Sequence, residues 1–348
     1  VRGAEVVGSS VIALGRDEIE SAGQVSLDRM LKDLPQNFDL GVSENSRAQS
    51  GGSGNIVYGN TVNLRGIGPY ATLVLVDGHR VTNNSRSTDP SIMPTLAVER
   101  VEVVADGASA IYGSDAVAGV VNLIPRRNLD GFEVYARGGL SEPGDFHETL
   151  VGAAWGTVFE RGQLMLAYER VDRSNLSGDD RDFFRADQRA RGGRDYRTTR
   201  CNPGTLVIGS TTYAIPAGGL TAGNVANLTP DTANRCDELT GQDLFPEQSY
   251  DSLASTFTYR ISPRITLLGD AYYSQRDFLR QSPQTTARLT VPETNAFFVR
   301  PDGFAGTSYL VDYSFAGELP ANHARGSAKN WQVTPAVRFA LGGDWQAE

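Results

Sequence analysis

The sequence predicts two structural regions in succession: a small α+β domain over residues 1–127, then antiparallel, membrane-spanning β-strands of a barrel over residues 128–348. Three observations support this fold class. Residues 1–127 mix short helical and β-type segments. From Gly131 onward, apolar and polar residues alternate with a period of two. The connections between the alternating segments are short and very long in turn, which is typical of outer-membrane barrels.

The composition narrows the class of protein. The chain has 348 residues, a formal net charge of −9, 40% hydrophobic residues and 38 Gly. This acidic balance argues against a general nucleic-acid binder, which normally presents a net basic surface. No run approaches the roughly 18 consecutive apolar residues of a membrane-spanning helix. Alternating strands keep the average hydropathy low, so a membrane barrel remains compatible with this composition.

The N-terminal region contains signals for both helices and strands. Ser26 is a candidate N-cap for a helix over Ser26–Leu34, and Pro35 ends it. Asp77-Gly78 is a strong hairpin-turn signal before Arg80–Val81. The other expected elements are a short helix at Arg16–Ile19, a Gly- and Ser-rich loop at Arg47–Asn60, β-type runs at Val62–Leu64, Thr72–Val76 and Val98–Val104, a helical turn at Ala108–Tyr112 and a strand at Val117–Ile124.

The segments after Gly131 have the length and pattern of tilted membrane strands, about 9 to 11 residues each. Leu253, Phe257 and Ile261 share one face of a strand, and Ala254 and Thr256 share the other. The expected strands are Phe132–Leu140, Leu150–Thr157, Gly162–Val171, Leu253–Ile261, Ile265–Ser274 and Trp331–Phe339.

The connections between these strands indicate which ends face which side of a membrane. The short ones are Val158–Arg161, Ser262–Arg264 and Leu341–Gly343, and the long ones are about 172–249 and 277–328. In outer-membrane barrels short turns face the periplasm and long loops face the outside. A soluble all-β domain is the alternative, although it offers no reason for so regular an alternation.

Cys201 and Cys236 both lie in the first long connection, which predicts a disulfide in an oxidising compartment. Closing a loop of that size contributes about 3–4 kcal/mol in the chain-entropy model. Two unpaired thiols are the alternative.

The sequence contains candidate motifs for cofactor binding and metal ligation, but the residues around each of them argue against that role. Gly66-Ile67-Gly68-Pro69-Tyr70-Ala71 spells a dinucleotide fingerprint, but Pro69 breaks the loop and a strand-like segment follows it. Gly51–Gly54 lacks the Gly-Lys-Ser/Thr of a phosphate loop. His79, His147 and His323 lie in unrelated segments without metal-ligand spacing. We therefore expect no enzyme activity, no cofactor and no metal site.

Four segments in order resemble the plug domain of TonB-dependent outer-membrane receptors. They are Asn63–Gly68 (NLRGIG), Thr72–Val81 (TLVLVDGHRV), Val98–Val103 (VERVEV) and Gly107–Ile124 (GASAIYGSDAVAGVVNLI), with a helical region at Leu27–Pro35 that is also similar to the family's. Together they cover about 125 residues. The later segments resemble the family's barrel only in their strand pattern. The resemblance implies a plug at residues 1–127 that fills a 22-stranded barrel, of which residues 128–348 would be the first part.

The resemblance implies structural or locking roles for a set of plug residues. The family's LRG and ERVEV motifs each contain an arginine that pairs with carboxylates, including acids of the barrel wall. In this sequence the two arginines are Arg65 and Arg100. Glu99 and Glu102 are local partners, because a buried unpaired Arg is very costly. The full set is Arg65, Gly66, Asp77, Gly78, Glu99, Arg100, Glu102, Tyr112 and Gly113, with Gly119 as a further turn or close-packing glycine.

Two departures from the family pattern stand out. Asp106-Gly107-Ala108 replaces the basic residue and Gly-Pro that many members carry. The TonB-coupling box is missing, and we expect it upstream of Val1, together with a removed or preceding signal peptide. Six or seven strands cannot close a barrel, so we expect truncation at both ends.

In the family, ligand binds at the plug apices and on the inner faces of the long loops. The apices here are expected at Arg47–Asn60 and Thr82–Ser91, which makes Tyr58, Asn83, Asn84 and Arg86 the candidate ligand contacts. The first long loop is rich in arginine interleaved with aspartate. It either receives an anionic ferric siderophore or is a salt-bridged surface loop. Stacking of an oligosaccharide on Tyr196, Tyr213 or Phe183 is a further alternative.

The predicted function is TonB-dependent uptake of a scarce nutrient across the bacterial outer membrane, with a ferric siderophore as the first cargo class. Oligosaccharide or vitamin uptake by the same mechanism is the second. A passive porin or adhesin barrel and a secreted β-rich enzyme are the rivals from other classes. The implied partners are TonB, an extracellular small ligand and outer-membrane lipid, without nucleic acid.

Overall fold

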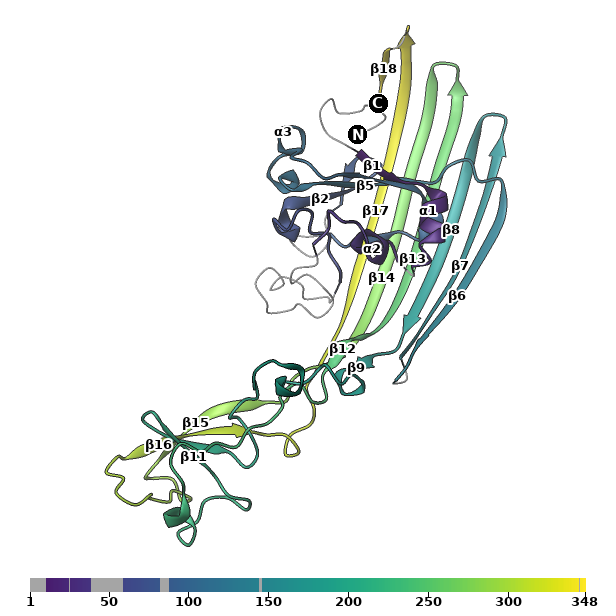
Figure 1. The fold of residues 1–348 in the computed structure, drawn as a ribbon. Helices are drawn as coiled ribbons and strands as arrows, with labels where there is room; N and C mark the ends of the chain where they lie inside the picture. The colour runs from purple at the N-terminus through teal and green to yellow at the C-terminus, as the bar shows by residue number, and fades with distance from the viewer. Residues whose placement is uncertain (1–10, 25, 39–58, 82–87, 144–145, 344) are drawn as a thin grey trace. The chain divides into compact units, whose positions relative to one another are not determined.

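A computed structural model describes residues 11–24, 26–38, 59–81, 88–143, 146–343 and 345–348. They form two compact units (Figure 1). Unit 1 contains Val1–Asn175, Phe245–Leu279 and Arg325–Glu348, and unit 2 contains Leu176–Leu244 and Arg280–Ala324. The part of unit 1 before the long strands, residues 1–127, is called here the N-terminal region. In the part of the chain that the structure describes, no helix has the length and apolarity needed to span a membrane.

The N-terminal region of unit 1 is built on a five-stranded sheet with the order β1-β4-β5-β2-β3. β2 and β5 are parallel, and the other neighbours are antiparallel. Its strands are β1 (Val11–Leu14), β2 (Thr72–Val76), β3 (His79–Arg80), β4 (Val98–Val104) and β5 (Gly119–Pro125). Its helices are α1 (Arg16–Ser21), α2 (Leu27–Lys32) and α3 (Ser109–Tyr112), with 3-10 turns η1 (Pro69–Ala71), η2 (Pro90–Ile92), η3 (Thr95–Ala97) and η4 (Ser114–Ala116).

Most of the expected local elements are present. The strands expected at Thr72–Val76 and Val98–Val104 are β2 and β4 with the same bounds. Asp77 and Gly78 both have positive φ, 47° and 81°, and turn the chain from Val76 to His79. Positive φ at two consecutive residues is the geometry of a tight hairpin turn, for which Asp-Gly is suited. Gly66, Gly113 and Gly119 also have positive φ, as expected.

The expected strand at Val62–Leu64 was wrong, since it forms only an isolated bridge between Leu64 and Asn37. Two of its amides bond to side chains instead of a neighbouring strand: the Asn63 amide donates to Asn37 Oδ1 (2.8 Å) and the Leu64 amide to Thr72 Oγ1 (3.2 Å). Val62 and Leu64 are buried, so the apolar run reflects packing in the core and no ladder. The helix expected at Ser26–Leu34 ends at Lys32, and Ser26 takes the N-cap position without a side-chain cap bond.

The second sheet of unit 1 consists of long strands in the order β18-β17-β14-β13-β8-β7-β6. These are β6 (Gly131–Ser141), β7 (Phe146–Phe159), β8 (Gly162–Arg173), β13 (Glu247–Ser262), β14 (Ile265–Gln281), β17 (His323–Gly342) and β18 (Trp345–Ala347). The strands are longer than expected, and β17 has 20 residues. The hydrophobic alternation marks only the apolar part of each strand, while polar residues continue the ladder beyond it.

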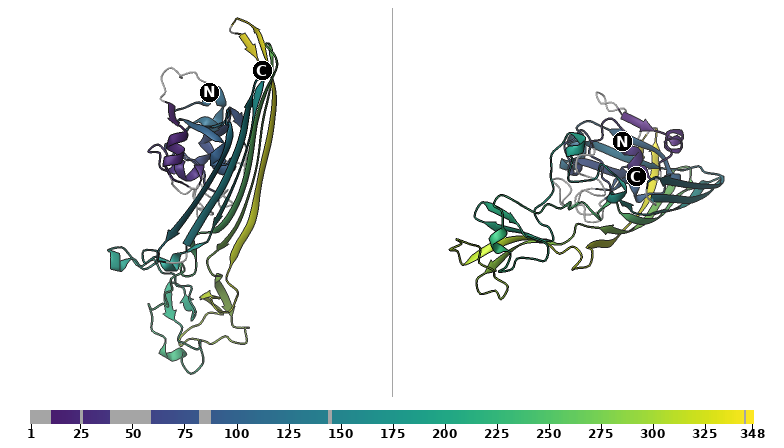
Figure 2. Two further views of the ribbon diagram at one scale, coloured as in Figure 1. Left: turned by 90° about the vertical axis from the view of Figure 1, so that its right-hand side faces the viewer. Right: turned by 60° about the horizontal axis from the view of Figure 1, so that its bottom comes forward.

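The long strands separate two environments. The N-terminal region packs on one face, called here the inner face (Figure 2). Ala254 and Thr256 on that face are each 1% exposed, whereas Leu253 and Trp331 on the other face are 45% and 74% exposed. The apolar core of the N-terminal region continues into small and medium residues of the strands, namely Ala154, Met165, Ala167, Ala254 and Tyr272.

Unit 2 forms from the two long connections, which were expected to be loops and instead contain a four-stranded sheet. Its order is β11-β10-β16-β15, so strands from the first connection pair with strands from the second. The strands are β10 (Thr205–Ile208), β11 (Thr211–Ala214), β15 (Thr286–Pro292) and β16 (Ser308–Ser314), and β9 (Leu176–Ser177) pairs with β12 (Asp243–Phe245). Further 3-10 turns are η5 (Gly178–Asp180), η6 (Arg189–Arg191) and η7 (Val225–Asn227). β10 and β16 pair although they are about 100 residues apart, and no local sequence pattern predicts a pairing over that distance.

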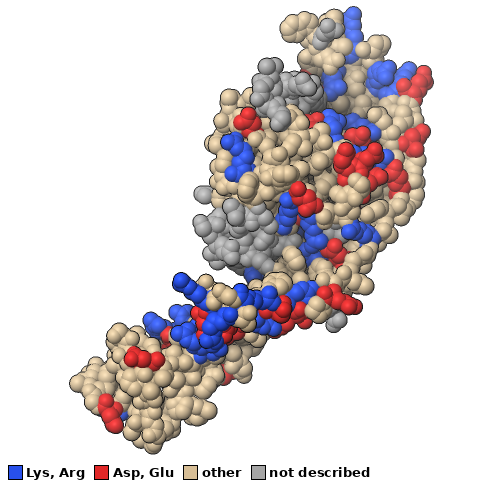
Figure 3. Space-filling model, in the orientation of Figure 1, with Lys and Arg blue, Asp and Glu red and all other residues tan. Residues whose placement is uncertain are grey.

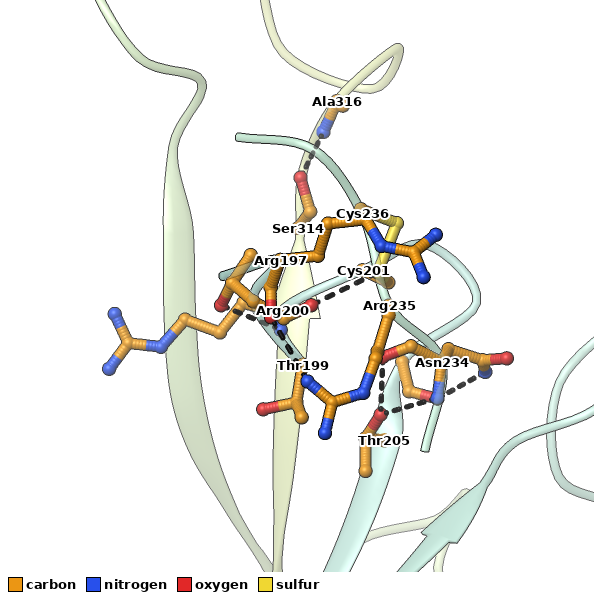
Figure 4. Close-up of a disulfide and its surroundings, with 12 residues drawn as sticks. Arg197, Thr199, Arg200, Cys201, Thr205, Asn234, Arg235, Cys236, Ser314 and Ala316 are labelled. Atoms are coloured by element: carbon orange, nitrogen blue, oxygen red, sulfur yellow. Dashed lines mark hydrogen bonds between the residues drawn. A yellow bond between two sulfur atoms is a disulfide. The ribbon is translucent and has the colours of Figure 1, made fainter. Parts of the chain in front are cut away.

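The disulfide expected between Cys201 and Cys236 is present in unit 2, with Cα atoms 5.5 Å apart (Figure 4). Thr198 and Cys236 exchange both backbone hydrogen bonds (3.1 and 3.0 Å). The Ser314 amide of β16 donates to the Cys201 carbonyl (2.9 Å). The disulfide therefore joins two segments that are already hydrogen-bonded to the sheet.

Gly119→Ala provides a test of the central strand. A Cβ at Gly119 would overlap the Val104 carbonyl and crowd Leu64, whereas one at Gly68, also at positive φ, would meet nothing within 4 Å. We expect Gly119→Ala to lower the free energy of unfolding by about 1–3 kcal/mol more than Gly68→Ala. Urea unfolding of the full-length protein in detergent measures both. Equal losses would show that close approach of β4 and β5 does not constrain this position.

Candidate functional site

The candidate functional site is the interface between the N-terminal region and the inner face of the long strands. Charged and polar groups join the two surfaces beside the apolar cluster that they share. Their partners are far apart in sequence, so each contact fixes one surface on the other. The contacts fall into three groups along the strands.

The first group is a buried ion pair between Asp89 and Arg276 of β14. Arg276 contacts Asp89 Oδ2 and donates to Ser91 Oγ (3.0 Å). The side chains of Arg276 and Asp89 are only 9% and 3% exposed. The Ser91 amide and hydroxyl donate to Asp89 Oδ1 (2.9 and 2.5 Å), and the Arg276 guanidinium lies 5.6 Å from the centre of the Tyr250 ring. The carboxylate is thus bonded on both oxygens.

Neighbouring residues depend on this pair. A Cβ at Gly59 would overlap both Arg276 and Asp89, so only glycine allows the chain to pass there. A small cavity of about 50 Å³ adjoins the pair, with Asp28 and Asn60 in its wall, and the Asn60 amide donates to Asp28 (2.5 Å). Burial raises the pKa of Asp89 from its ordinary value, against the opposing charge of Arg276. Desolvation is therefore a large cost at this position.

The second group holds η3 from two sides. Glu169 of β8 accepts from the Thr95 amide (3.1 Å) and from the Thr95 hydroxyl. Arg16 of α1 donates to the carbonyls of Thr95 (2.6 Å) and Val98 (3.2 Å). A carboxylate of the wall and a guanidinium of the N-terminal region thus satisfy opposite ends of the same short turn.

The third group lies where the N-terminal region leads into the strands. Arg127 bridges Asp77 (2.9 Å) and Asp270 of β14 (2.7 Å). Arg126 forms a bidentate pair with Glu133 of β6 (2.6 and 2.8 Å). Separately, Arg29 of α2 pairs with Glu148 of β7 (2.7 Å). These contacts link the N-terminal region to three different strands.

The expected locking residues have a more local role than anticipated. Arg65 lies 3.8 Å from Asp106, and Arg100 pairs with Glu102 (2.8 Å). All four belong to the N-terminal region, so the expected pairing of Arg65 and Arg100 with barrel-wall acids is not found among the described residues. Both Arg side chains are more than 40% exposed, at 46% and 41%, so neither demands a buried partner.

Other expected residues are placed as follows. Glu99 forms no ion pair within the described ranges. The Tyr112 carbonyl accepts from Arg80, which also pairs with Asp115 (2.7 Å). Tyr58, Asn83, Asn84 and Arg86 lie outside the described residues. The residues that the sequence reasoning missed are Asp89, Arg276, Glu169, Arg29, Arg126 and Arg127.

The arginine-rich part of unit 2 is a salt-bridged surface, which was one of the two expected alternatives. Arg189 and Arg197 alternate with Asp187 and Asp195 at 2.7–3.8 Å, and Figure 3 shows blue and red groups interleaved over this unit. The Arg189 guanidinium holds the pKa of Asp187 below its usual range, and Arg288 does the same for Asp312. These arginines are engaged by protein carboxylates.

A five-stranded mixed sheet that packs on the inner face of long antiparallel strands is the arrangement of a plug against part of a barrel wall. Residues 4–120 match the family model described as TonB-dependent Receptor Plug Domain. Residues 4–120 are therefore a TonB-dependent receptor plug domain, and the long strands that follow have the fold of part of a receptor barrel. Receptors of this family reside in the bacterial outer membrane and are transporters rather than enzymes.

Solved structures similar to this chain are ferric enterobactin receptors of Pseudomonas aeruginosa. One variant in complex with enterobactin is 20% identical, with a TM-score of 0.52 over 79% of this chain and 34% of that receptor. Another, also in complex with enterobactin, is 15% identical, with a TM-score of 0.53 over 97% of this chain and 48% of that receptor. The chain thus spans between a third and a half of these receptors. At such identities the likeness shows the fold.

The buried pair allows a mutational test. Asp89→Ala leaves Arg276 buried without its carboxylate, so we expect a loss of about 3–5 kcal/mol in the free energy of unfolding. Asp89→Ala combined with Arg276→Met removes both charges and should recover most of that loss. The exposed pair Arg80–Asp115 is the control, where Asp115→Ala should cost below about 1 kcal/mol.

Urea unfolding of the full-length protein measures all three variants against the wild type. A loss below about 1 kcal/mol for Asp89→Ala, or no recovery in the double variant, would contradict a buried, mutually dependent pair.

Proposed function

We propose that the full-length protein is an active transporter, which binds a scarce extracellular nutrient and releases it to the periplasm when TonB acts on the plug. The observation that carries this proposal is the nature of the plug–strand interface. Buried or partly buried ion pairs such as Asp89–Arg276 and Arg127–Asp270 join the plug to the strands, beside an apolar cluster that the two share. Charged groups regain hydration when they separate, so such an interface opens at lower cost than a dry apolar one.

The first cargo class is a ferric siderophore. Its support is the similarity in fold to receptors for ferric enterobactin. Uptake of an oligosaccharide or vitamin by the same mechanism is the second candidate. The arginines of unit 2 do not separate the two classes, because Arg185, Arg189, Arg191 and Arg197 are paired with aspartates. The coupling to TonB and the cargo are both parts of the proposal.

Uptake measured in cells tests it. The full-length protein is produced in a bacterium lacking its own siderophore receptors, with and without TonB, and accumulation of radioactive iron as ferric enterobactin is followed. We expect uptake with TonB and a loss of at least about tenfold without it, because a plug that remains seated blocks the barrel. Cyanocobalamin and a maltooligosaccharide serve as the alternative cargoes.

Equal uptake with and without TonB would contradict active transport and favour a passive porin. TonB-dependent uptake of cyanocobalamin or oligosaccharide, without uptake of iron, would replace the cargo and retain the mechanism.

A further inference from the structure

A large hollow lies between the plug and the tight-turn ends of the long strands. Its volume is about 920 Å³. Its plug wall is formed around Asp77, Arg100 and Arg127, and its strand wall by the β7–β8 turn and the adjoining ends of β13, β14 and β17. Since tight turns face the periplasm in outer-membrane barrels, this hollow opens on the release side of the plug.

Arginine dominates the lining. The lining contains five arginines and two carboxylates. The arginines are Arg100, Arg127, Arg161, Arg260 and Arg338, and the carboxylates are Asp77 and Glu160. Three of the five are paired with carboxylates of the same walls. Arg100 pairs with Glu102, Arg127 with Asp77 and Asp270, and Arg338 with Glu348.

The other two arginines have no such partner. Arg161 and Arg260 form no ion pair within the ranges that the structure describes, and both side chains are exposed. The Arg260 amide donates to the Arg161 carbonyl (2.6 Å), so the two residues are held side by side at the ends of neighbouring strands. Glu160, next to Arg161 in sequence, lines the hollow without an ion pair in the described chain.

We propose that this hollow is a release-side binding site for an anionic group, a carboxylate, phosphate or phenolate, carried by the cargo. The inference rests on the proposed transport function and narrows the cargo to anions. Arginine matches planar and tetrahedral oxyanions with paired hydrogen bonds. Two adjacent arginines against the single carboxylate of Glu160 attract an anion to this part of the hollow. Cargo that passes the plug on this side would be held at Arg161 and Arg260 before it leaves.

The site is tested first by equilibrium binding. Isothermal titration of the full-length receptor in detergent uses pyrophosphate as the probe at low salt. We expect Arg161→Gln/Arg260→Gln to weaken pyrophosphate binding about tenfold or more, because two charge-assisted donors are lost. Arg264→Gln is the matched control, since Arg264 is an exposed turn residue that does not line the hollow. It should change the affinity by less than about twofold.

Uptake in cells is the second measurement. The double variant should bind ferric enterobactin at the cell surface with unchanged affinity but accumulate it several-fold more slowly, while Arg264→Gln behaves as the wild type. Pyrophosphate that binds the wild type and the double variant equally, or neither, overturns the site. Arginine-dependent pyrophosphate binding in a receptor that takes up no iron leaves the anion site standing and contradicts the proposed cargo.

Discussion

The structure depends on one constraint: a charge removed from water between two surfaces must meet its partner on the opposite surface. Asp89 and Arg276 satisfy it at 3% and 9% side-chain exposure. Each side chain alone would be a buried uncompensated charge, which is far more costly than the pair. The pair therefore contributes little net stability but strongly specifies position. Only one placement of the plug on β14 satisfies both groups.

The same constraint recurs along the interface. Glu169 of β8 bonds to Thr95, Glu148 of β7 pairs with Arg29, and Asp270, on the same strand as Arg276, pairs with Arg127. Apolar contacts also join the two surfaces, because the core of the plug continues into Ala154, Met165, Ala167, Ala254 and Tyr272 of the strands. A second apolar cluster lies within the plug alone, at Leu73, Leu75, Val104, Ala116 and Val120.

Local chemistry was predictable from the sequence, and distant pairing was not. The Asp77-Gly78 turn needs only a left-handed backbone at two residues, and the strand faces need only a period of two. Val62–Leu64 failed because burial and strand pairing give the same apolar signal. Asp89 and Arg276 are 187 residues apart, so no local pattern marks them as partners. The sheet of unit 2 was missed for the same reason, since β10 pairs with β16 across the intervening strands.

We propose that the plug is locked at Asp89 and Arg276 and separates from β14 there during transport. The most direct measurement is uptake of ferric enterobactin by a full-length Asp89→Cys/Arg276→Cys variant, whose two cysteines are joined by a dithio-bridged bismaleimide that spans the former ion pair and is then cleaved with dithiothreitol. Wild type treated in the same way controls for reduction of the Cys201–Cys236 bond. The account predicts little or no uptake while the lock is closed and recovery on reduction. Uptake at the wild-type rate with the cross-link fully formed would contradict it.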